Sequence, residues 1–361
     1  MSLGEMSRAV ETPGSVLIYV ASDSPADGLV KLPFARALRN AFPRAEITWL
    51  AGKGTSAYAH SLAPLVGGFI DEVVEEAGIG RQWSELLKPP LSGTRLAGRR
   101  FDLIIDTQRQ FGTALLLKRI PTPCFISGAA DYLLSDRRPP RPRRKQPTKV
   151  RQMLRLAELA SGQPADIRGE PPDDPQLNAL AARLLPEGCR YVGLAPGAGS
   201  EHKRWPLQRY LELGAAQFAA GHVPVVFLGP EEGHWALPVR EALPQALLPL
   251  QAEAVARLGP SPLVTIALAR RLAVAVANDA GIGHMMAAAN CPLVCLFGPT
   301  APERSAPLVP RAQVLCAQSY GGEAMENIPL AAVRNAVDCL LEGTTEDSAA
   351  KARPAAGRAV Y

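Results

Sequence analysis

Short apolar runs alternate along the chain with stretches in which apolar residues recur every three or four positions. The runs predict buried β-strands, and the wider spacing predicts helices with one apolar face. In the first half the strand candidates are residues 16–21, 47–51, 69–74, 101–106 and 124–127, and the clearest helices cover 28–42 and 151–160. This alternation is typical of an α/β fold in which helices cover both faces of a parallel sheet.

Two segments interrupt the alternation near the middle of the chain. Residues 137–151 hold eight basic side chains interleaved with prolines, and residues 165–175 are rich in Pro and Asp. Proline at this density disfavours both helix and central strand. We therefore place the domain junction here, with an N-terminal domain over 1–160 and a C-terminal domain over 161–345. The pattern fades beyond these residues, and we expect 346–361 to form a disordered tail.

The second half repeats the alternation. Strands are predicted at 191–195, 223–228, 246–250, 272–277 and 292–297, and helices at 207–220, 231–243, 262–271, 281–290 and 330–341. Two such halves predict two Rossmann-like domains that face each other across a cleft. Ligands of open α/β sheets lie at the carboxyl ends of the strands, so the loops that follow the strands are where function is expected.

Composition narrows the class of protein. The 361 residues suffice for two substantial cores, and the net charge of +5 is mild and local, which gives no reason to expect nucleic-acid binding. No stretch approaches the roughly 20 apolar residues of a membrane-spanning helix. Residues 1–13 lack the apolar core of a secretory signal, and the six cysteines are scattered without a matched pair of CxxC motifs. We expect a cytoplasmic protein with reduced thiols.

The most informative segment is residues 278–284, with the sequence Asn-Asp-Ala-Gly-Ile-Gly-His. It follows a buried strand and opens a helix. Free N–H groups at a helix start attract anions, and phosphate is the usual ligand. Asp279 adds an acceptor and His284 a donor, so the segment predicts a site for the phosphates of a nucleotide-type ligand.

A second glycine-containing loop leaves the strand at 191–195 and enters the next helix near Pro206. Its glycines let the backbone approach a ligand closely, and Lys203 supplies a positive charge suited to a phosphate. The alternative is an exposed loop with incidental basic residues. Because the loop and the 278–284 segment follow strands of the same predicted sheet, the phosphate-binding interpretation is favoured.

The first strand is also followed by a polar loop. Asp27 starts the next helix, where its ordinary role is an N-cap and its functional role is a carboxylate in the cleft. Lys31 lies one turn later on the same helical face. Asp106 and Gln108, at the end of another strand, are further candidates for contact with a substrate, with a strand-end cap as the alternative.

These segments resemble glycosyltransferase family 9, the ADP-heptose:lipopolysaccharide heptosyltransferases. The similar parts are Ala-Asp-Gly-Leu-Val-Lys-Leu-Pro at 26–33, Phe-Asp-Leu-Ile-Ile-Asp-Thr-Gln at 101–108, Pro-Gly at 196–197 with Lys-Arg-Trp-Pro at 203–206, and 278–284 with Phe-Gly-Pro-Thr at 297–300. The resemblance spans about residues 16 to 341. It implies the GT-B architecture, in which the C-terminal Rossmann-like domain holds most of the donor.

The resemblance assigns a role to each matching residue. It implies that Asp27 is the general base for the acceptor hydroxyl and that Lys203 binds donor phosphate. Glu231 matches the acid that contacts the donor ribose, with Glu232 as an adjacent competitor.

The remaining roles fall in the 278–284 segment. Asp279 is implied to orient the sugar or its phosphate, while the backbone of Ala280 and Gly281, together with His284, holds the diphosphate. The family often has Thr at the position of Ala280 and Gly at the position of Ala26. The change at Ala280 removes a hydroxyl and keeps the backbone donor.

The chemistry of glycosyl transfer suits these residue types. Oriented N–H groups and Lys203 stabilise the departing diphosphate, and a carboxylate accepts the proton of the attacking hydroxyl. One base without a second nucleophile favours inversion at the anomeric carbon. No Asp-x-Asp cluster lies near the donor loops, so we expect neither a metal nor another cofactor.

The predicted function is therefore an inverting, metal-independent glycosyltransferase that moves a sugar, heptose by resemblance, from a nucleotide diphosphate, with an ADP-sugar favoured, to a glycolipid or saccharide acceptor. The basic run at 137–151 is read as a solvated linker, with contact to a phosphorylated glycolipid or the inner membrane surface as the alternative. Two other classes stay open. One is a nucleotide-sugar epimerase or Rossmann oxidoreductase, although no G-x-G-x-x-G follows 16–21. The other is a nucleotide-sugar-binding relative without catalysis.

Overall fold

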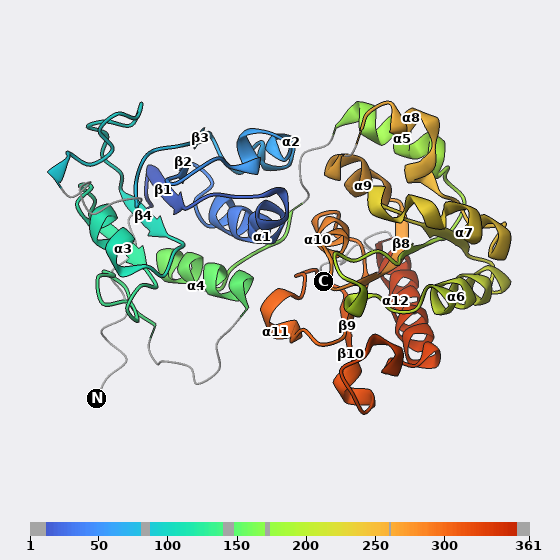
Figure 1. Cartoon of the computed structure of the whole chain (residues 1–361). Helices are drawn as coiled ribbons and strands as arrows, with labels where there is room; N and C mark the ends of the chain where they lie inside the picture. The colour runs from blue at the N-terminus through green and yellow to red at the C-terminus, as the bar shows by residue number, and fades with distance from the viewer. Residues whose placement is uncertain (1–11, 81–86, 140–147, 170–173, 260, 352–361) are drawn as a thin grey trace, which may run out of the picture. The chain divides into compact units, whose positions relative to one another are not determined.

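The computed structural model describes the chain except for residues 1–11, 81–86, 140–147, 170–173, 260 and 352–361. It divides into two compact units, Met1–Pro172 and Asp173–Tyr361. Each unit contains one five-stranded sheet in which every pair of neighbouring strands is parallel (Figure 1). The predicted α/β class with two Rossmann-like units is therefore confirmed.

The first unit has the strand order β3-β2-β1-β4-β5. Its strands are β1 (Ser15–Val20), β2 (Glu46–Ala51), β3 (Glu72–Val74), β4 (Leu103–Asp106) and β5 (Cys124–Ser127). Its α-helices are α1 (Pro25–Ala41), α2 (Ala63–Val66), α3 (Phe111–Lys118) and α4 (Lys149–Ser161). Helices α1 and α4 pack side by side (Figure 1).

The second unit has the strand order β10-β9-β8-β6-β7. Its strands are β6 (Tyr191–Ala195), β7 (Val223–Val226), β8 (Leu272–Asn278), β9 (Leu293–Phe297) and β10 (Ala312–Cys316). Its α-helices are α5 (Pro175–Leu184), α6 (Leu207–Ala219), α7 (Ala236–Ala242), α8 (Glu253–Ala256), α9 (Pro262–Ala269), α10 (Gly281–Ala288), α11 (Pro302–Ser305) and α12 (Leu330–Lys351).

Both sheets contain a point at which the direction of strand addition reverses. In the first unit the chain builds β1, β2 and β3 in one direction and then adds β4 on the other side of β1. The second unit does the same between β6 and β8, and a single parallel bridge from Val225 to Leu247 continues the sheet beyond β7. Open α/β sheets bind ligands at such switch points, so each unit offers one expected site.

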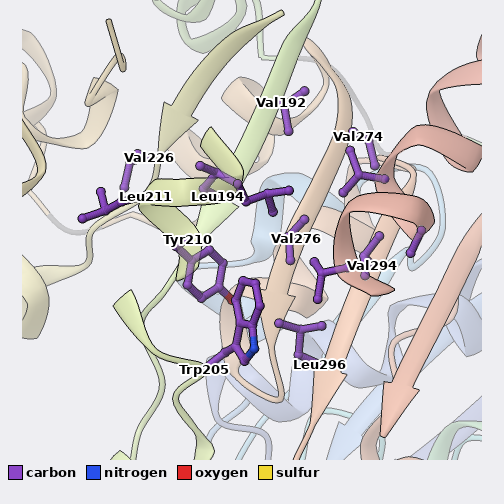
Figure 2. Close-up of a cluster of buried hydrophobic side chains, with 14 of the residues drawn as sticks. Val192, Leu194, Trp205, Tyr210, Leu211, Val226, Val274, Val276, Val294 and Leu296 are labelled. Atoms are coloured by element: carbon purple, nitrogen blue, oxygen red, sulfur yellow. The ribbon is translucent and has the colours of Figure 1, made fainter. Parts of the chain in front are cut away.

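Two apolar layers enclose the sheet of the second unit. Side chains alternate along a strand, so Val274 and Val276 of β8 enter one layer while Ala275 and Ala277 enter the other. The first layer contains Trp205 next to Tyr210, whose rings meet edge to face with centroids 5.0 Å apart (Figure 2). Trp205 is fully buried and its Nε1 donates to the Ile328 carbonyl at 3.0 Å, so the loop before α6 is anchored in the core.

Several predicted elements differ from the structure, and the strand predicted at 69–74 is shortened to Glu72–Val74. The predicted strand at 246–250 is reduced to the Leu247 bridge, and the helix predicted at 231–243 begins as a 3-10 helix over Pro230–Trp235. The last helix continues past 341 to Lys351, because Gly343 lowers helix stability by only about 1 kcal/mol and no proline follows before Pro354. Strand β10 was missed because it is an edge strand with exposed positions and therefore lacks an apolar run. Among the described residues, no helix is long and apolar enough to cross a membrane.

Candidate functional site

The switch point of the second unit is held together by one buried amide. Asn278, the last residue of β8, donates from Nδ2 to the Pro196 carbonyl at 2.8 Å. Its Oδ1 accepts from the Trp205 backbone N–H at 3.2 Å and from the Tyr210 hydroxyl at 3.1 Å. Asn278 therefore ties the loop after β6 to the start of α6. Sequence reasoning assigned it no role, although a polar residue ending a buried strand was a usable signal.

We call these hydrogen bonds of the Asn278 amide the Asn278 clasp. Lys203 forms an ion pair with Asp279, the next residue of the chain. The Lys203 ammonium lies 2.7 Å from Asp279 Oδ2, and the Ser305 hydroxyl donates to Asp279 Oδ1 at 2.9 Å. The side chain of Asp279 is 9% exposed and that of Lys203 is 29% exposed, so the carboxylate is largely enclosed while the ammonium reaches the surface. The structure thus brings together two residues that were predicted to bind the donor and adds Ser305, which no sequence pattern singled out.

The start of α10 follows at once. Ala280 is its N-cap and supplies no side-chain acceptor for the first turn, so the leading N–H groups at Gly281 remain able to bind a ligand. His284 lies in this first turn and is half-buried. Burial lowers the pKa of His284, and the nearby Asp279 carboxylate partly opposes this shift. A neutral imidazole donates one N–H, so His284 and the first turn of α10 together offer hydrogen-bond donors to an anion.

A second acid faces the glycine loop. Glu232 is buried, and a Cβ added to Gly197 would lie 2.6 Å from the Glu232 carboxyl carbon. Arg204 donates to the Ala198 carbonyl at 3.0 Å and lies 3.8 Å from Glu232 Oε1. Glu231, the predicted ribose contact, is exposed. The acid at the loop is thus the adjacent Glu232, and a role for Glu231 remains a prediction.

The first unit has a cavity of about 420 Å³ at the carboxyl ends of β1 and β4. We call it the first-unit cavity. All four residues that the sequence selected in this unit line it, namely Asp27, Lys31, Asp106 and Gln108. Its wall also includes Arg109, Gly128, Asp131, Tyr132, Lys149 and Arg155. Charged side chains are among the lining residues, and the cavity lies at the switch point of the sheet, where a ligand is expected.

Asp27 is exposed and occupies the third position of α1. The N-cap is Ser24 and not Asp27: the Ser24 hydroxyl accepts from the Asp27 N–H at 3.2 Å and donates to Asp27 Oδ2 at 2.7 Å. This reciprocal pair caps the helix start through the Ser24 hydroxyl and fixes the direction of the carboxylate. Asp27 therefore serves the helix and also presents an accessible carboxylate to the cavity.

Lys31 is already paired. Its ammonium forms an ion pair with Asp23, a buried residue that also accepts from Trp49 Nε1 at 2.8 Å and from the Ser56 hydroxyl at 3.0 Å. Asp23 was missed because it reads as one polar residue in a polar turn. Contact of Lys31 with an acceptor remains a prediction, and its charge at the cavity wall is offset by Asp23.

Asp106 ends β4 and is completely buried. The Ser127 hydroxyl donates to Oδ2 at 2.7 Å, and the Gln108 N–H donates to Oδ1 at 2.8 Å. Burial raises the pKa of Asp106 to about 7, although both hydrogen bonds lower it. Asp106, one of the residues that line the cavity, consequently holds the loop at Gln108 in place. In the described part of the chain, no group of three or more His, Cys, Asp or Glu residues could hold a metal ion.

Two parallel α/β units, one with the Lys203–Asp279 pair beside a helix start and the other with a cavity at its switch point, are the layout of the GT-B class. The sequence profile described as Glycosyltransferase family 9 (heptosyltransferase) matches residues 92–327. The chain belongs to this family. The recognition made from the motifs at 203–206 and 278–284 is confirmed.

Individual relatives agree with the family. Lipooligosaccharide heptosyltransferase 2 of Haemophilus influenzae is 31% identical over 125 residues, which are 34% of this chain and 36% of the relative. Lipopolysaccharide heptosyltransferase 2 of Escherichia coli is 35% identical over 131 residues, 34% of this chain and 35% of the relative. The matches thus span about a third of these curated relatives.

Solved structures extend the similarity of fold to nearly the whole chain. ADP-heptose lps heptosyltransferase II of E. coli has a TM-score of 0.61 at 20% identity, covering 92% of this chain and 99% of that one. A glycosyl transferase family 9 protein of Veillonella parvula has a TM-score of 0.63 at 18% identity, covering 91% and 98%. E. coli heptosyltransferase WaaC with ADP has a TM-score of 0.59 at 19% identity, covering 90% and 99%.

Proposed function

We propose that the protein is an inverting, metal-independent glycosyltransferase that transfers heptose from an ADP-sugar to a lipopolysaccharide-type glycolipid. Family membership supports glycosyl transfer, and the names of the matched relatives support heptose and the lipopolysaccharide acceptor. The observation that carries the proposal is the arrangement of Lys203, Asp279 and the start of α10 at the switch point of the second unit.

The donor diphosphate binds at this switch point. Lys203 and the N–H groups at Gly281 stabilise the negative charge that grows on the leaving ADP, and His284 donates a further hydrogen bond. Asp279 orients Lys203, since its other oxygen is held by Ser305. Glu232 lies against the glycine loop and is the acid we assign to the donor ribose. These groups stabilise the charge on the leaving ADP without a metal ion.

Asp27 accepts the proton of the attacking acceptor hydroxyl. The Ser24 hydroxyl orients its carboxylate, while the acceptor saccharide lies in the first-unit cavity. The bond between the acceptor oxygen and the anomeric carbon forms as the bond to the diphosphate breaks. Because Asp27 acts as a base and not as a nucleophile, the product has the inverted configuration.

Two variants test this assignment. Asp27→Asn should lower kcat by a factor on the order of 10² or more, as expected for removal of a general base, and should leave ADP affinity unchanged. Lys203→Met should weaken ADP binding by about 1.5–3 kcal/mol, the range for a charged hydrogen bond. Transfer is measured with ADP-heptose and a heptose-deficient lipopolysaccharide, and binding by titration calorimetry with ADP.

Each variant has a matched control. Ser24→Ala removes the hydroxyl that orients the carboxylate but keeps the carboxylate itself, so it should lose clearly less activity than Asp27→Asn. Lys118→Met removes a lysine that pairs with Asp136 on the surface of the first unit, and should bind ADP normally. Equal losses for Asp27→Asn and Ser24→Ala would show a purely structural role. Binding of ADP without transfer by the unmodified protein would identify a non-catalytic nucleotide-sugar-binding protein.

A further inference from the structure

Three consecutive residues after β5 adopt a left-handed backbone. Ala130, Asp131 and Tyr132 have φ values of 45°, 52° and 64°. None is glycine, and side chains with a Cβ crowd the following carbonyl in this region, so left-handed residues normally occur singly and as Gly, Asn or Asp. We call this segment the left-handed turn. Its conformation is unfavourable by itself and must be imposed by its surroundings.

Hydrogen bonds hold the turn at both ends. The Ser127 hydroxyl accepts from the Ala129 N–H at 3.1 Å while it donates to the buried Asp106. Beyond the turn, the Ser135 N–H donates to the Tyr132 carbonyl at 3.1 Å and the Asp136 N–H donates to the Phe125 carbonyl at 2.8 Å. The turn is therefore fixed to β5 and, through Ser127, to the end of β4.

This fixed turn forms part of the wall of the first-unit cavity. Asp131 and Tyr132 line the same cavity as Asp27. The Tyr132 ring lies over Gly128, since a Cβ added to Gly128 would be 3.9 Å from Tyr132 Cζ. Asp131 is exposed, while Tyr132 is half-buried and burial raises the pKa of its hydroxyl although Arg155 and Arg109 oppose the shift. An accessible carboxylate and a neutral, well-oriented aromatic ring thus stand next to each other on the cavity wall.

Such a pair suits one kind of ligand. A carboxylate accepts hydrogen bonds from neighbouring hydroxyl groups, and an aromatic ring covers the C–H face of a sugar. The strained backbone also sets the directions of both side chains before a ligand binds, so binding requires no conformational change of the turn.

We propose that the left-handed turn binds the sugar ring that carries the attacking hydroxyl, with Asp131 accepting from its hydroxyl groups and Tyr132 packing on its face. This inference rests on the proposed glycosyl transfer and adds the residues that determine acceptor specificity. It also assigns the strain of Ala130 to positioning of the acceptor.

Steady-state kinetics and thermal unfolding test it. Asp131→Asn should raise the acceptor KM by about tenfold or more, the effect of one charged hydrogen bond, while the donor KM and the binding of ADP stay as in the unmodified protein. Tyr132→Ala should do the same, and Tyr132→Phe should be close to the unmodified protein because the ring is kept. The acceptor is heptose-deficient lipopolysaccharide.

Two substitutions to glycine separate the effect of backbone strain on stability from the effect of the turn on acceptor binding. Ala130→Gly relaxes the turn and should raise both the melting temperature and the acceptor KM. Glu76→Gly is the matched control, because Glu76 is another exposed non-glycine residue with positive φ, 51°, that lies outside the cavity lining. It should raise the melting temperature and leave the acceptor KM unchanged.

The outcomes distinguish this inference from the proposed function. An unchanged acceptor KM in Asp131→Asn and Tyr132→Ala, with active unmodified protein, overturns the turn's role and leaves glycosyl transfer standing. Equal changes in donor and acceptor KM would also overturn it, since they indicate a general structural effect. Absence of transfer by the unmodified protein overturns both.

Discussion

Asp106 shows how strongly the stability contributed by one buried side chain can depend on its protonation state. Its carboxyl group has no access to water, and its two hydrogen-bond donors do not fully replace hydration. The same residue type at the end of a strand would be unremarkable on a surface. From the sequence it was expected to touch the acceptor. It is one of the residues that line the first-unit cavity, and its contact with an acceptor stays a prediction.

The raised pKa gives a pH dependence with a definite sign. The ordinary pKa of Asp is 3.8, and the pKa of Asp106 in the folded protein is about 7. Between these two pH values the native state holds the proton more tightly than the unfolded state. Stability from this group is therefore greatest at low pH and is lost as pH rises toward 7. Asp106→Asn mimics the protonated form and should become more stable than the unmodified protein above pH 7, by up to a few kcal/mol.

Urea unfolding at pH 5 and pH 8 measures this difference. The exposed Glu241→Gln provides the control for removing one carboxylate, and its effect should be the same at both pH values. An Asp106→Asn variant that is equally destabilised at pH 5 and pH 8 would contradict a charge buried without adequate compensation.

At the scale of elements, the pattern of apolar residues was sufficient to predict the bounds of strands and helices that are packed against the core. Strands β5 and β6 and helix α6 lie within one residue of their predicted bounds because their apolar residues face the core. It was insufficient at the edge, where β10 exposes Val314 and carries no continuous run. The donor loop and the start of α10 were also predicted, since strand, glycine turn and helix are local features. The contact of Asn278 with Trp205 joins residues 73 positions apart, and no local pattern encodes it.

Asn278 makes an element-level prediction possible. Asn278→Ala leaves the Tyr210 hydroxyl and the Trp205 N–H without their shared acceptor, which should lower stability by about 2–4 kcal/mol. Tyr210→Phe removes one of these bonds and keeps the ring, so about 1 kcal/mol is expected. Chemical unfolding measures both, and ADP titration should show weaker binding for Asn278→Ala alone. Normal stability of Asn278→Ala would mean that the loop is held by the Trp205 side chain without the amide.

For the whole molecule, the separate hydrophobic cores are the main feature. The first unit buries side chains such as Phe125 and Leu117, and the second has two clusters of its own around Trp205 and Phe227. The repeated alternation of strands and helices was enough to predict two such units. The sequence was not enough to predict which acid of the pair at 231 and 232 faces the glycine loop. That choice depends on the turn that the chain takes after Gly229.

Separate cores should unfold separately. We expect two calorimetric transitions, and ADP at 100 times its Kd should stabilise one of them by about 2.7 kcal/mol. Lys203→Met should reduce that shift at the same ADP concentration, and Asp27→Asn should preserve it. A single transition that ADP shifts as a whole would contradict independent unfolding of the units.

The clasp at Asn278 has one more consequence. Since one amide fixes the strand end, the glycine loop and the following helix together, nucleotide capture needs little ordering of the backbone there, and affinity is not reduced by that entropy loss. Divergence toward other sugar nucleotides would then be confined to segments outside the clasp, such as 229–232 and 298–307. Exchange of those short segments between relatives is a direct route to altered donor preference with the scaffold intact.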